Sequence, residues 1–449
     1  MTLKVTKLAL SSRLIILAVQ MLANWIVPDH KPDVFRMPMP TPNATNPDHY
    51  LDKLVMRCLG GLRHWDGEYF LHIANYLYTY ENTLAFYPLY PVLVRNLAAA
   101  LETFNVPISM HALTLVVAVA LNVWLFCEAA NYLYQLTQRV FNDLHKSWNA
   151  ALVFCFNPAS IFFSAAYSES LFTYASFILM LECVRAKQQF NFMRICASLA
   201  ACIMCRSNGL IALGFPLYFF ARHILLTTNV KRCQQVIKMA LAVLIPLAIL
   251  HAYYFYIYRL YCMPGIKVKH PQQVLHYASE RNYLLAGRGP KGSPWCQYTL
   301  PFPYSYVQST YWDVGFLRYY QWKQLPNFLL ALPMLVFMQW HCCDYLWFLA
   351  SKIWPQVASW REPLKSQKSL PFVLHGAFLT LVCALFVHIQ VSTRLLASAT
   401  PIFYWFAADH MPKSLAHLSL RSKAGALFIW CTTYCACGTV LYCNNFPWT

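Results

Sequence analysis

Two carboxylates set among aromatic side chains are the first candidates for chemistry. Asp66 and Glu68 lie in the segment 64–70, where the order is His-Trp-Asp-Gly-Glu-Tyr-Phe. Aromatic neighbours partly remove water from a carboxylate, and such a carboxylate is a better base toward a hydroxyl group. Aromatic faces beside acidic groups also suit a sugar ring, which makes Trp65 a candidate contact. An interfacial aromatic belt in which Asp66 caps a helix fits the same residues.

Glu169, Arg206 and Arg394 are charged residues at the ends of apolar stretches. Guanidinium groups offer forked donors and keep their charge, so both arginines suit a phosphate group. An ionisable residue deep in apolar sequence is a functional candidate, although Glu169 fits a helix N-cap equally well. Each arginine could instead form a structural ion pair with Glu169 or with Asp313.

The composition requires these residues to sit in a membrane protein. Of the 449 residues, 58% are hydrophobic and only 12% are charged, whereas ordinary globular proteins carry about 25% charged residues. The chain therefore cannot cover a soluble surface of its size, and it must face lipid. The net charge of +18 comes from short basic clusters between apolar runs, which is typical of membrane-protein loops and argues against a nucleic-acid partner.

About eleven apolar stretches are predicted transmembrane helices, and some are short enough to be broken or re-entrant. They are residues 8–27, 107–136, 149–164, 168–184, 195–205, 209–225, 236–258, 328–340, 370–389, 395–408 and 425–442. With the N-terminus in the cytosol, the five loops that fall on the cytosolic side are all basic, as the positive-inside rule requires. The opposite, luminal side then receives the C-terminus and two large segments, 28–106 and 261–326.

The candidate residues fall on this predicted luminal side. Asn43 begins an Asn-Ala-Thr triplet in segment 28–106 and is a glycosylation acceptor only if that segment is luminal. Trp312 and Asp313 lie in an aromatic, proline-containing part of segment 261–326. This part fits a loop that closes over a site, and it fits a loop that only anchors at the interface.

The 17 cysteines lie mostly inside apolar runs and lack the paired spacing of zinc ligands. We interpret most of them as small buried apolar residues. Cys262 and Cys296 flank a polar segment and are the one pair that we expect to form a disulfide. The sequence predicts no metal site.

Six segments, in the expected order, resemble the GPI mannosyltransferase 2 family of the GT-C glycosyltransferase class. They are residues 64–70, 86–91, 156–172, 206–209, 311–316 and 388–394. The run 157–172 is the most specific of them, whereas the Trp-Asp pair in 64–70 would be weak evidence alone. Together these segments extend over most of the chain.

The resemblance implies an all-α, multi-pass enzyme of the endoplasmic reticulum membrane, with residues 1–449 in one domain and a luminal active site. It also implies transfer of the second mannose, in α1,6 linkage, from dolichyl-phosphate mannose to a GPI precursor that carries one mannose. The partners would be these two lipids and the bilayer, and a small membrane partner subunit stays open. We expect no cofactor and no metal, because no nucleotide leaves.

Conversion of a β-linked phosphomannose into an α-mannoside needs a single in-line displacement, with a base and a group that stabilises the departing phosphate. We expect Asp66 to be the base, with Glu68 as its neighbour or substitute. Arg206 and Arg394 would bind the phosphate, and Glu169 would position the acceptor or an arginine. The resemblance implies further substrate contacts at Trp65, Trp312, Asp313, His388 and Gln390.

Two other classes of protein stay open. Another GT-C mannosyltransferase, acting on an N-glycan lipid precursor or a protein, would share the topology but not the run 157–172. A polytopic lipid carrier or scramblase would need acidic residues along both sides of the membrane. The unexplained polar residues of this chain gather on one predicted side instead.

Overall fold

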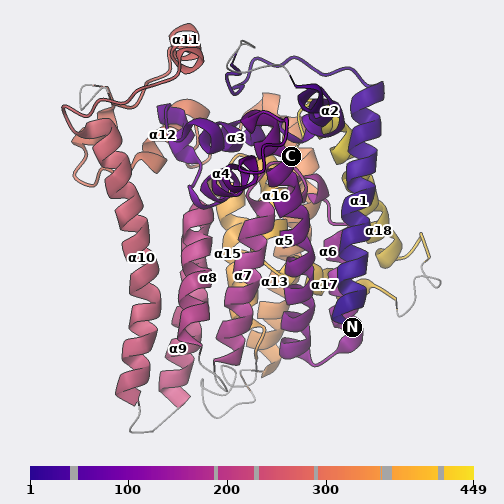
Figure 1. The fold of residues 1–449 in the computed structure, drawn as a ribbon. Helices are drawn as coiled ribbons and strands as arrows, with labels where there is room; N and C mark the ends of the chain where they lie inside the picture. The colour runs from indigo at the N-terminus through magenta and orange to yellow at the C-terminus, as the bar shows by residue number, and fades with distance from the viewer. Residues whose placement is uncertain are drawn as a thin grey trace.

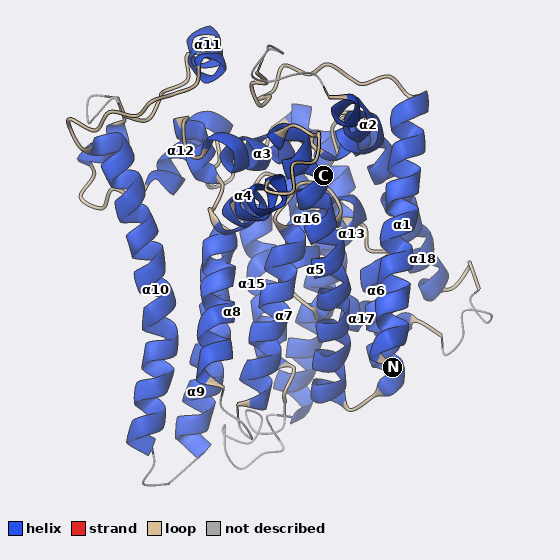
Figure 2. Cartoon of the chain, in the orientation of Figure 1, coloured by secondary structure: helices blue, strands red, loops and turns tan. Residues whose placement is uncertain are grey.

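The computed structural model describes residues 1–40, 49–186, 191–226, 232–287, 292–353, 355, 367–412 and 419–448. Within these ranges the ordered elements are helices (Figure 2), and the only β-pairing is an isolated bridge between Tyr80 and Leu285. The all-α prediction is therefore confirmed. Asn43, the predicted glycosylation residue, lies outside the described residues.

Five helical segments are long and apolar enough to cross a membrane. They are α1 (Thr2–Ile26), α5 (Met110–Phe141), Gln234–Cys262 within α10 (Arg232–Cys262), Trp322–Ile353 around α13 (Leu325–Phe348), and α18 (Lys423–Cys443). A helix satisfies its own backbone groups, which is why it can cross lipid. The chain is therefore a polytopic membrane protein, as predicted.

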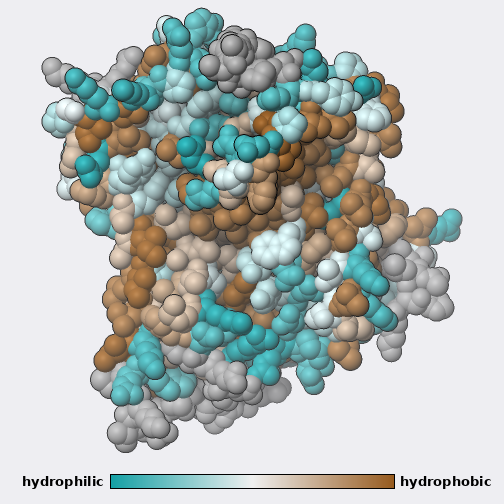
Figure 3. Space-filling model, viewed as in Figure 1, coloured by the Kyte–Doolittle hydropathy of each residue, from teal (hydrophilic) through white to brown (hydrophobic). Residues whose placement is uncertain are grey.

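Apolar side chains remain uncovered on the outer faces of the bundle. On α10, Ile237, Leu241, Leu244 and Phe255 are exposed, and Figure 3 shows apolar surface along this helix and hydrophilic side chains toward both ends of the molecule. Exposed apolar side chains of this number are costly in water but suit contact with lipid tails. The outer face of α10 is therefore suited to a bilayer.

Shorter helices complete the bundle and pack against α5, α10 and α13. They are α6 (Leu144–Cys155), α7 (Glu169–Arg185), α8 (Phe192–Cys205), α9 (Gly214–Leu226), α15 (Leu370–Leu385), α16 (Ser392–Ala399) and α17 (Ile402–His410). Polar turns separate several of them. The residues that matter for the site lie in these turns or in the first residues of the helices beside them.

Five further helices lie across one end of the bundle (Figure 1), which we call the capped end. They are α2 (Tyr50–Leu59), α3 (Asp66–Tyr76), α4 (Leu89–Glu102), α11 (Gln272–Arg281) and α12 (Pro303–Trp312). They belong to the two large segments 28–106 and 261–326, which the fold thus brings to the same end. The C-terminus also lies at the capped end, and the N-terminus lies toward the opposite one.

A buried carboxylate and a disulfide hold the cap together. Glu81 accepts hydrogen bonds from the indole N–H of Trp295 and the hydroxyl of Tyr311, each at 2.9 Å. The disulfide joins Cys262 to Cys296, so that prediction is confirmed. Because Glu81 belongs to the first segment and its partners belong to the second, these contacts fix α12 against the first segment at Glu81.

Candidate active site

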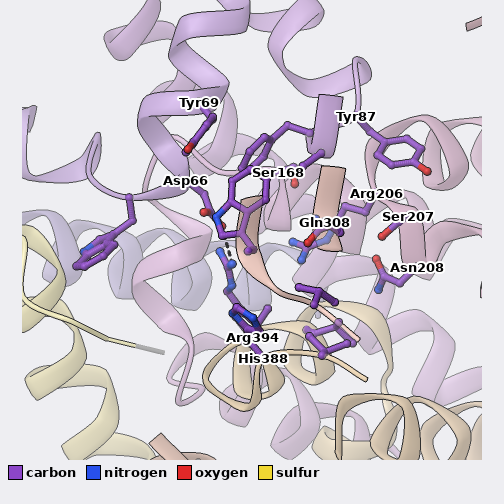
Figure 4. A pocket seen from close by; sticks show the side chains of 18 of the residues that line it. Asp66, Tyr69, Tyr87, Ser168, Arg206, Ser207, Asn208, Gln308, His388 and Arg394 are labelled. Atoms are coloured by element: carbon purple, nitrogen blue, oxygen red, sulfur yellow. Dashed lines mark hydrogen bonds and ion pairs between the residues drawn. The ribbon is translucent and has the colours of Figure 1, made fainter. Parts of the chain in front are cut away.

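A cavity of about 750 Å³ opens where the cap meets the bundle. Figure 4 shows Asp66 and Arg394 facing each other, with Arg206, Ser207 and Asn208 together on another side of the cavity. Both large segments and the turns of the bundle contribute to its wall. The predicted site residues that line it are Trp65, Asp66, Glu169, Arg206, Trp312, His388, Gln390 and Arg394.

Asp66 is the first residue of α3, and the backbone before it is strained. Trp65 has a φ of +56°, which is unfavourable for a bulky residue and persists only where surrounding contacts impose it. The backbone N–H of Asp66 donates to the hydroxyl of Tyr167 at 3.0 Å. The hydroxyl of Tyr442 donates to the carbonyl of His64 at 2.9 Å. These contacts fix the turn that places the Asp66 carboxylate in the cavity.

The Asp66 carboxylate forms a close ion pair with Arg394. Nη2 of Arg394 lies 2.5 Å from Oδ2 of Asp66, and Nη1 lies 3.7 Å from Oε1 of Glu169. The guanidinium carbon also lies 5.2 Å from the ring centre of Phe162 and 5.3 Å from that of Tyr167. Contact with two aromatic faces and two carboxylates holds a cation strongly. Arg394 is therefore fixed in the cavity wall before any substrate arrives.

Glu169 links the two arginines of the site. Its side chain is completely buried at the first turn of α7, and its carboxylate forms ion pairs with Arg206 and Arg394. Asp66, Arg394, Glu169 and Arg206 thus form a chain of alternating charges. The sequence left open whether the arginines pair with Glu169 or bind phosphate. Both do pair with it, and both also line the cavity.

The position of Arg206 depends on Gly209, three residues later in the chain. Arg206 follows the last residue of α8, and the chain then enters a short 3₁₀ helix, Ser207–Leu213. A Cβ at Gly209 would lie 2.1 Å from the carbonyl oxygen of Cys202. Only glycine permits this approach of the two backbones. The polar turn that begins with Arg206 therefore requires Gly209 for a packing reason.

Arg13 and Asn122 hold the turns between α6 and α7, and sequence reasoning missed both. The Arg13 guanidinium is buried and donates to the carbonyl oxygens of Cys155 and Ser160 at 3.0 and 2.7 Å. The buried amide of Asn122 donates to the carbonyl oxygen of Tyr167 at 2.9 Å. The signal was an arginine inside the first apolar span, since charged residues in membrane segments rarely lack a role.

The structure does not bring Glu68 to the cavity. Arg63 binds its carboxylate through two nitrogens at 2.7 and 3.1 Å, and the backbone N–H of Met37 donates to it at 3.0 Å. Glu68 is 6% exposed. Two residues along a helix point to different sides, so Asp66 and Glu68 diverge. The geometry gives Glu68 a structural role.

Asp313 also lies away from the cavity. It follows the last residue of α12 with a φ of +53°, a conformation that aspartate tolerates better than most residues. Its exposed carboxylate pairs with the exposed side chain of Arg318 at 3.2 Å. The structure therefore supports a helix-end role for Asp313, and substrate contact remains untested.

Trp312, His388 and Gln390 form the rest of the predicted wall. The ring of Trp312 lies 5.7 Å from that of Tyr69, centre to centre. His388 stacks on Tyr319 at 4.6 Å, and Gln390 accepts a hydrogen bond from the Tyr319 hydroxyl at 3.2 Å. A neutral imidazole can both donate and accept a hydrogen bond.

Metal ligands do not gather at this site. Across the part of the chain that the structure describes, no group of three or more His, Cys, Asp or Glu side chains is arranged to hold an ion. The positive charges of the cavity wall come from arginines instead. The expectation of metal-independent chemistry stays a prediction.

The fold and the cavity define a polytopic membrane protein with a preformed charged site at one end of its helix bundle. Residues 2–449 match the family model described as Mannosyltransferase (PIG-V), and the chain belongs to this family. It is therefore a mannosyltransferase, and the resemblance seen in the six segments is confirmed.

Curated relatives match over nearly the full length. GPI mannosyltransferase 2 of Drosophila melanogaster is 64% identical, with 100% of each chain covered. GPI alpha-1,6-mannosyltransferase 2 of Homo sapiens is 32% identical, with 99% of this chain and 98% of the human protein covered. GPI mannosyltransferase 2 of Yarrowia lipolytica is 27% identical, with 84% and 85% covered. The similarity to the fly and human proteins thus includes the segments that line the cavity.

Proposed function

We propose that this chain adds the second mannose of the GPI anchor, in α1,6 linkage, using dolichyl-phosphate mannose as donor. The acceptor is a GPI precursor that carries one mannose. The observation that carries this proposal is the cavity wall, in which the Asp66–Arg394 ion pair lies beside Glu169 and Arg206. The printed names of the fly and human relatives supply the GPI acceptor and the α1,6 linkage.

The proposed topology is a GT-C arrangement with eleven membrane passes in the endoplasmic reticulum and the cavity on the luminal side. Five long helices and several shorter apolar ones support this number of passes. The two termini lie toward opposite ends of the bundle, which agrees with an odd number. The positive-inside rule then assigns the basic loops to the cytosol and the capped end to the lumen.

The proposed reaction is a single displacement at C1 of the mannose. The acceptor oxygen forms a bond to C1 while Asp66 takes the hydroxyl proton. The bond from C1 to the phosphate oxygen breaks, and its electron pair leaves with the lipid phosphate. Arg206 and Arg394 stabilise the charge that develops on this phosphate. Attack from the face opposite the leaving group inverts the β-linked donor into an α-mannoside.

The remaining residues take supporting roles in this proposal. Trp65 and Trp312 offer aromatic faces to sugar rings, and His388 and Gln390 offer polar groups to hydroxyls. Glu169 fixes the two arginines rather than the acceptor, because its carboxylate is fully buried and paired with both of them. The positive charge at the phosphate comes from protein side chains, so the proposal includes no resident cofactor.

Lipid analysis of cells that lack this chain tests the function. We expect a GPI precursor with a single mannose to accumulate, and the wild-type chain to restore the next intermediate. A chain with Asp344→Asn is the matched control, because Asp344 is exposed on α13 away from the cavity wall. Accumulation of an N-glycan lipid precursor, or normal GPI intermediates in the deleted cells, would overturn the proposal.

A further inference from the structure

Four charged groups alternate in the cavity wall, and they are not equally buried. Glu169 has no exposed side-chain surface, whereas the Asp66 side chain is 28% exposed. Arg394 lies between them, 2.5 Å from Asp66 and 3.7 Å from Glu169. Two acidic and two basic groups cancel one another, so the empty cavity already satisfies its arginines.

This arrangement creates a competition for Arg394. A lipid phosphate that enters the cavity needs a cation, and Arg394 is already engaged by Asp66. Glu169 cannot be displaced easily, because a buried carboxylate freed from its arginines would be left without a partner at high cost. Asp66 can move toward the open cavity, where water and substrate hydroxyls can hydrogen-bond to it. Of the two acids, Asp66 is therefore the one that a phosphate replaces.

We propose that the Asp66–Arg394 ion pair is a lock that the donor phosphate opens. A phosphate oxygen takes the place of the Asp66 carboxylate on Arg394, while Glu169 keeps Arg394 and Arg206 in position. Asp66 is then released toward the acceptor side of the cavity. This inference rests on the proposed function for the role of Asp66 as base, but the displacement itself involves no sugar transfer.

The lock imposes an order on the reaction. Before the donor binds, the Asp66 carboxylate is occupied by its ion pair with Arg394. After the phosphate binds, the carboxylate is free to accept the acceptor's proton. The base therefore becomes available only when a leaving group is present. Donor binding precedes productive acceptor binding in this scheme.

Carboxylate labelling of the purified full-length chain in lipid nanodiscs tests the lock. The reagent is a hydrophobic carbodiimide, which reacts with protonated carboxyl groups, and peptide mass spectrometry measures the labelled fraction of Asp66. The probe is a polyprenyl phosphate without sugar, and the matched control is the polyprenol of equal length. We expect the phosphate to raise Asp66 labelling about tenfold or more, because the charge-assisted hydrogen bond to Arg394 no longer holds the carboxylate.

Glu68 serves as an internal standard in the same stretch of chain. Arg63 holds it outside the cavity at 2.7 Å, so its labelling must not respond to the phosphate. Unchanged or reduced labelling of Asp66 with polyprenyl phosphate would overturn the lock. An equal rise with polyprenol would overturn it as well, because lipid rather than phosphate would then be responsible.

A variant provides a second measurement. Arg394→Gln removes the cation, so Asp66 should label without phosphate to the level that wild type reaches with phosphate. Arg318→Gln, which removes only the exposed partner of Asp313, should label like wild type. If Arg394→Gln does not fold, the comparison of polyprenyl phosphate with polyprenol in the wild-type protein still tests the lock. The two proposals can fail separately. If Asp66 labelling responds to phosphate but the protein mannosylates another acceptor, the proposed function is wrong and the lock stands.

Discussion

Two acid–arginine pairs lie at the start of the same short helix, and they have different surroundings. Asp66 pairs with Arg394 in the cavity wall, while Glu68 pairs with Arg63 behind it. Asp66 is 28% exposed and Glu68 is 6% exposed. One carboxylate therefore faces space that a substrate can fill, and the other is enclosed by protein.

The difference follows from the partners as much as from the helix. Glu68 accepts three hydrogen bonds from its own cap segment, including one from the Met37 backbone. The partner of Asp66 comes from a helix 328 residues later in the chain. A pair made within one segment stabilises that segment, whereas a pair made between segments can be exchanged for a ligand. This comparison yields four predictions.

The largest effect should come from removing the exposed carboxylate. Asp66→Asn keeps the shape of the side chain but cannot take the acceptor's proton, so the transfer rate should fall on the order of 10² or more. Single-turnover transfer by purified protein, followed by mass spectrometry of the lipid product, measures this rate. Glu68→Gln is the paired control. If Asp66→Asn lowers the transfer rate by less than tenfold, Asp66 is not the base.

Arg394→Ala tests the other half of the same pair. Charge-assisted hydrogen bonds contribute about 1.5–3 kcal/mol each, so we expect the KM for the donor to rise about tenfold or more. The KM for the acceptor should change far less, because the phosphate belongs to the donor. Steady-state kinetics with each substrate varied in turn separates the two values. An unchanged donor KM would contradict phosphate binding by Arg394.

Much of the fold could be predicted from the sequence because lipid imposes a simple pattern. Apolar stretches predicted the long helices, and polar interruptions predicted the helix ends at which Glu169, Arg206 and Arg394 lie. The direction of each side chain could not be predicted in the same way. Whether Asp66 or Glu68 faces the cavity depends on where α3 begins, and that depends on the strained backbone of Trp65.

Long-range partners were the second gap. Arg13 could be recognised as an unusual charge in an apolar span, but its acceptors lie 142 and 147 residues away at Cys155 and Ser160. Hydrogen bonds to backbone carbonyls leave no pattern of residue types in the sequence. For Asp313 the sequence suggested substrate contact from its place in a familiar segment, and this stays a prediction. The structure places it at the end of α12, beside Arg318.

The enclosed pair should affect stability rather than chemistry. Glu68→Gln leaves Arg63 without its counter-ion, and breaking a buried pair costs about 3 kcal/mol or more. We expect a lower thermal unfolding midpoint in detergent, while the transfer rate per folded molecule stays within about threefold of wild type. Glu68→Asp keeps the negative charge, so its thermal unfolding midpoint should lie between those of Glu68→Gln and wild type. If Glu68→Gln instead lowers the transfer rate as much as Asp66→Asn does, at unchanged stability, Glu68 takes part in the reaction.

The smallest effect should come from the exposed pair at the end of α12. Asp313→Asn removes an ion pair in which both side chains are more than half exposed, and such pairs contribute about 0–1 kcal/mol. Asparagine also tolerates the positive φ at this position, so the helix end should survive. We therefore expect less than a twofold change in the KM for either substrate. A clear rise in either KM would mean that the cavity wall extends to Asp313 when substrate is bound, and exposure in the empty protein would then be a poor guide to its site residues.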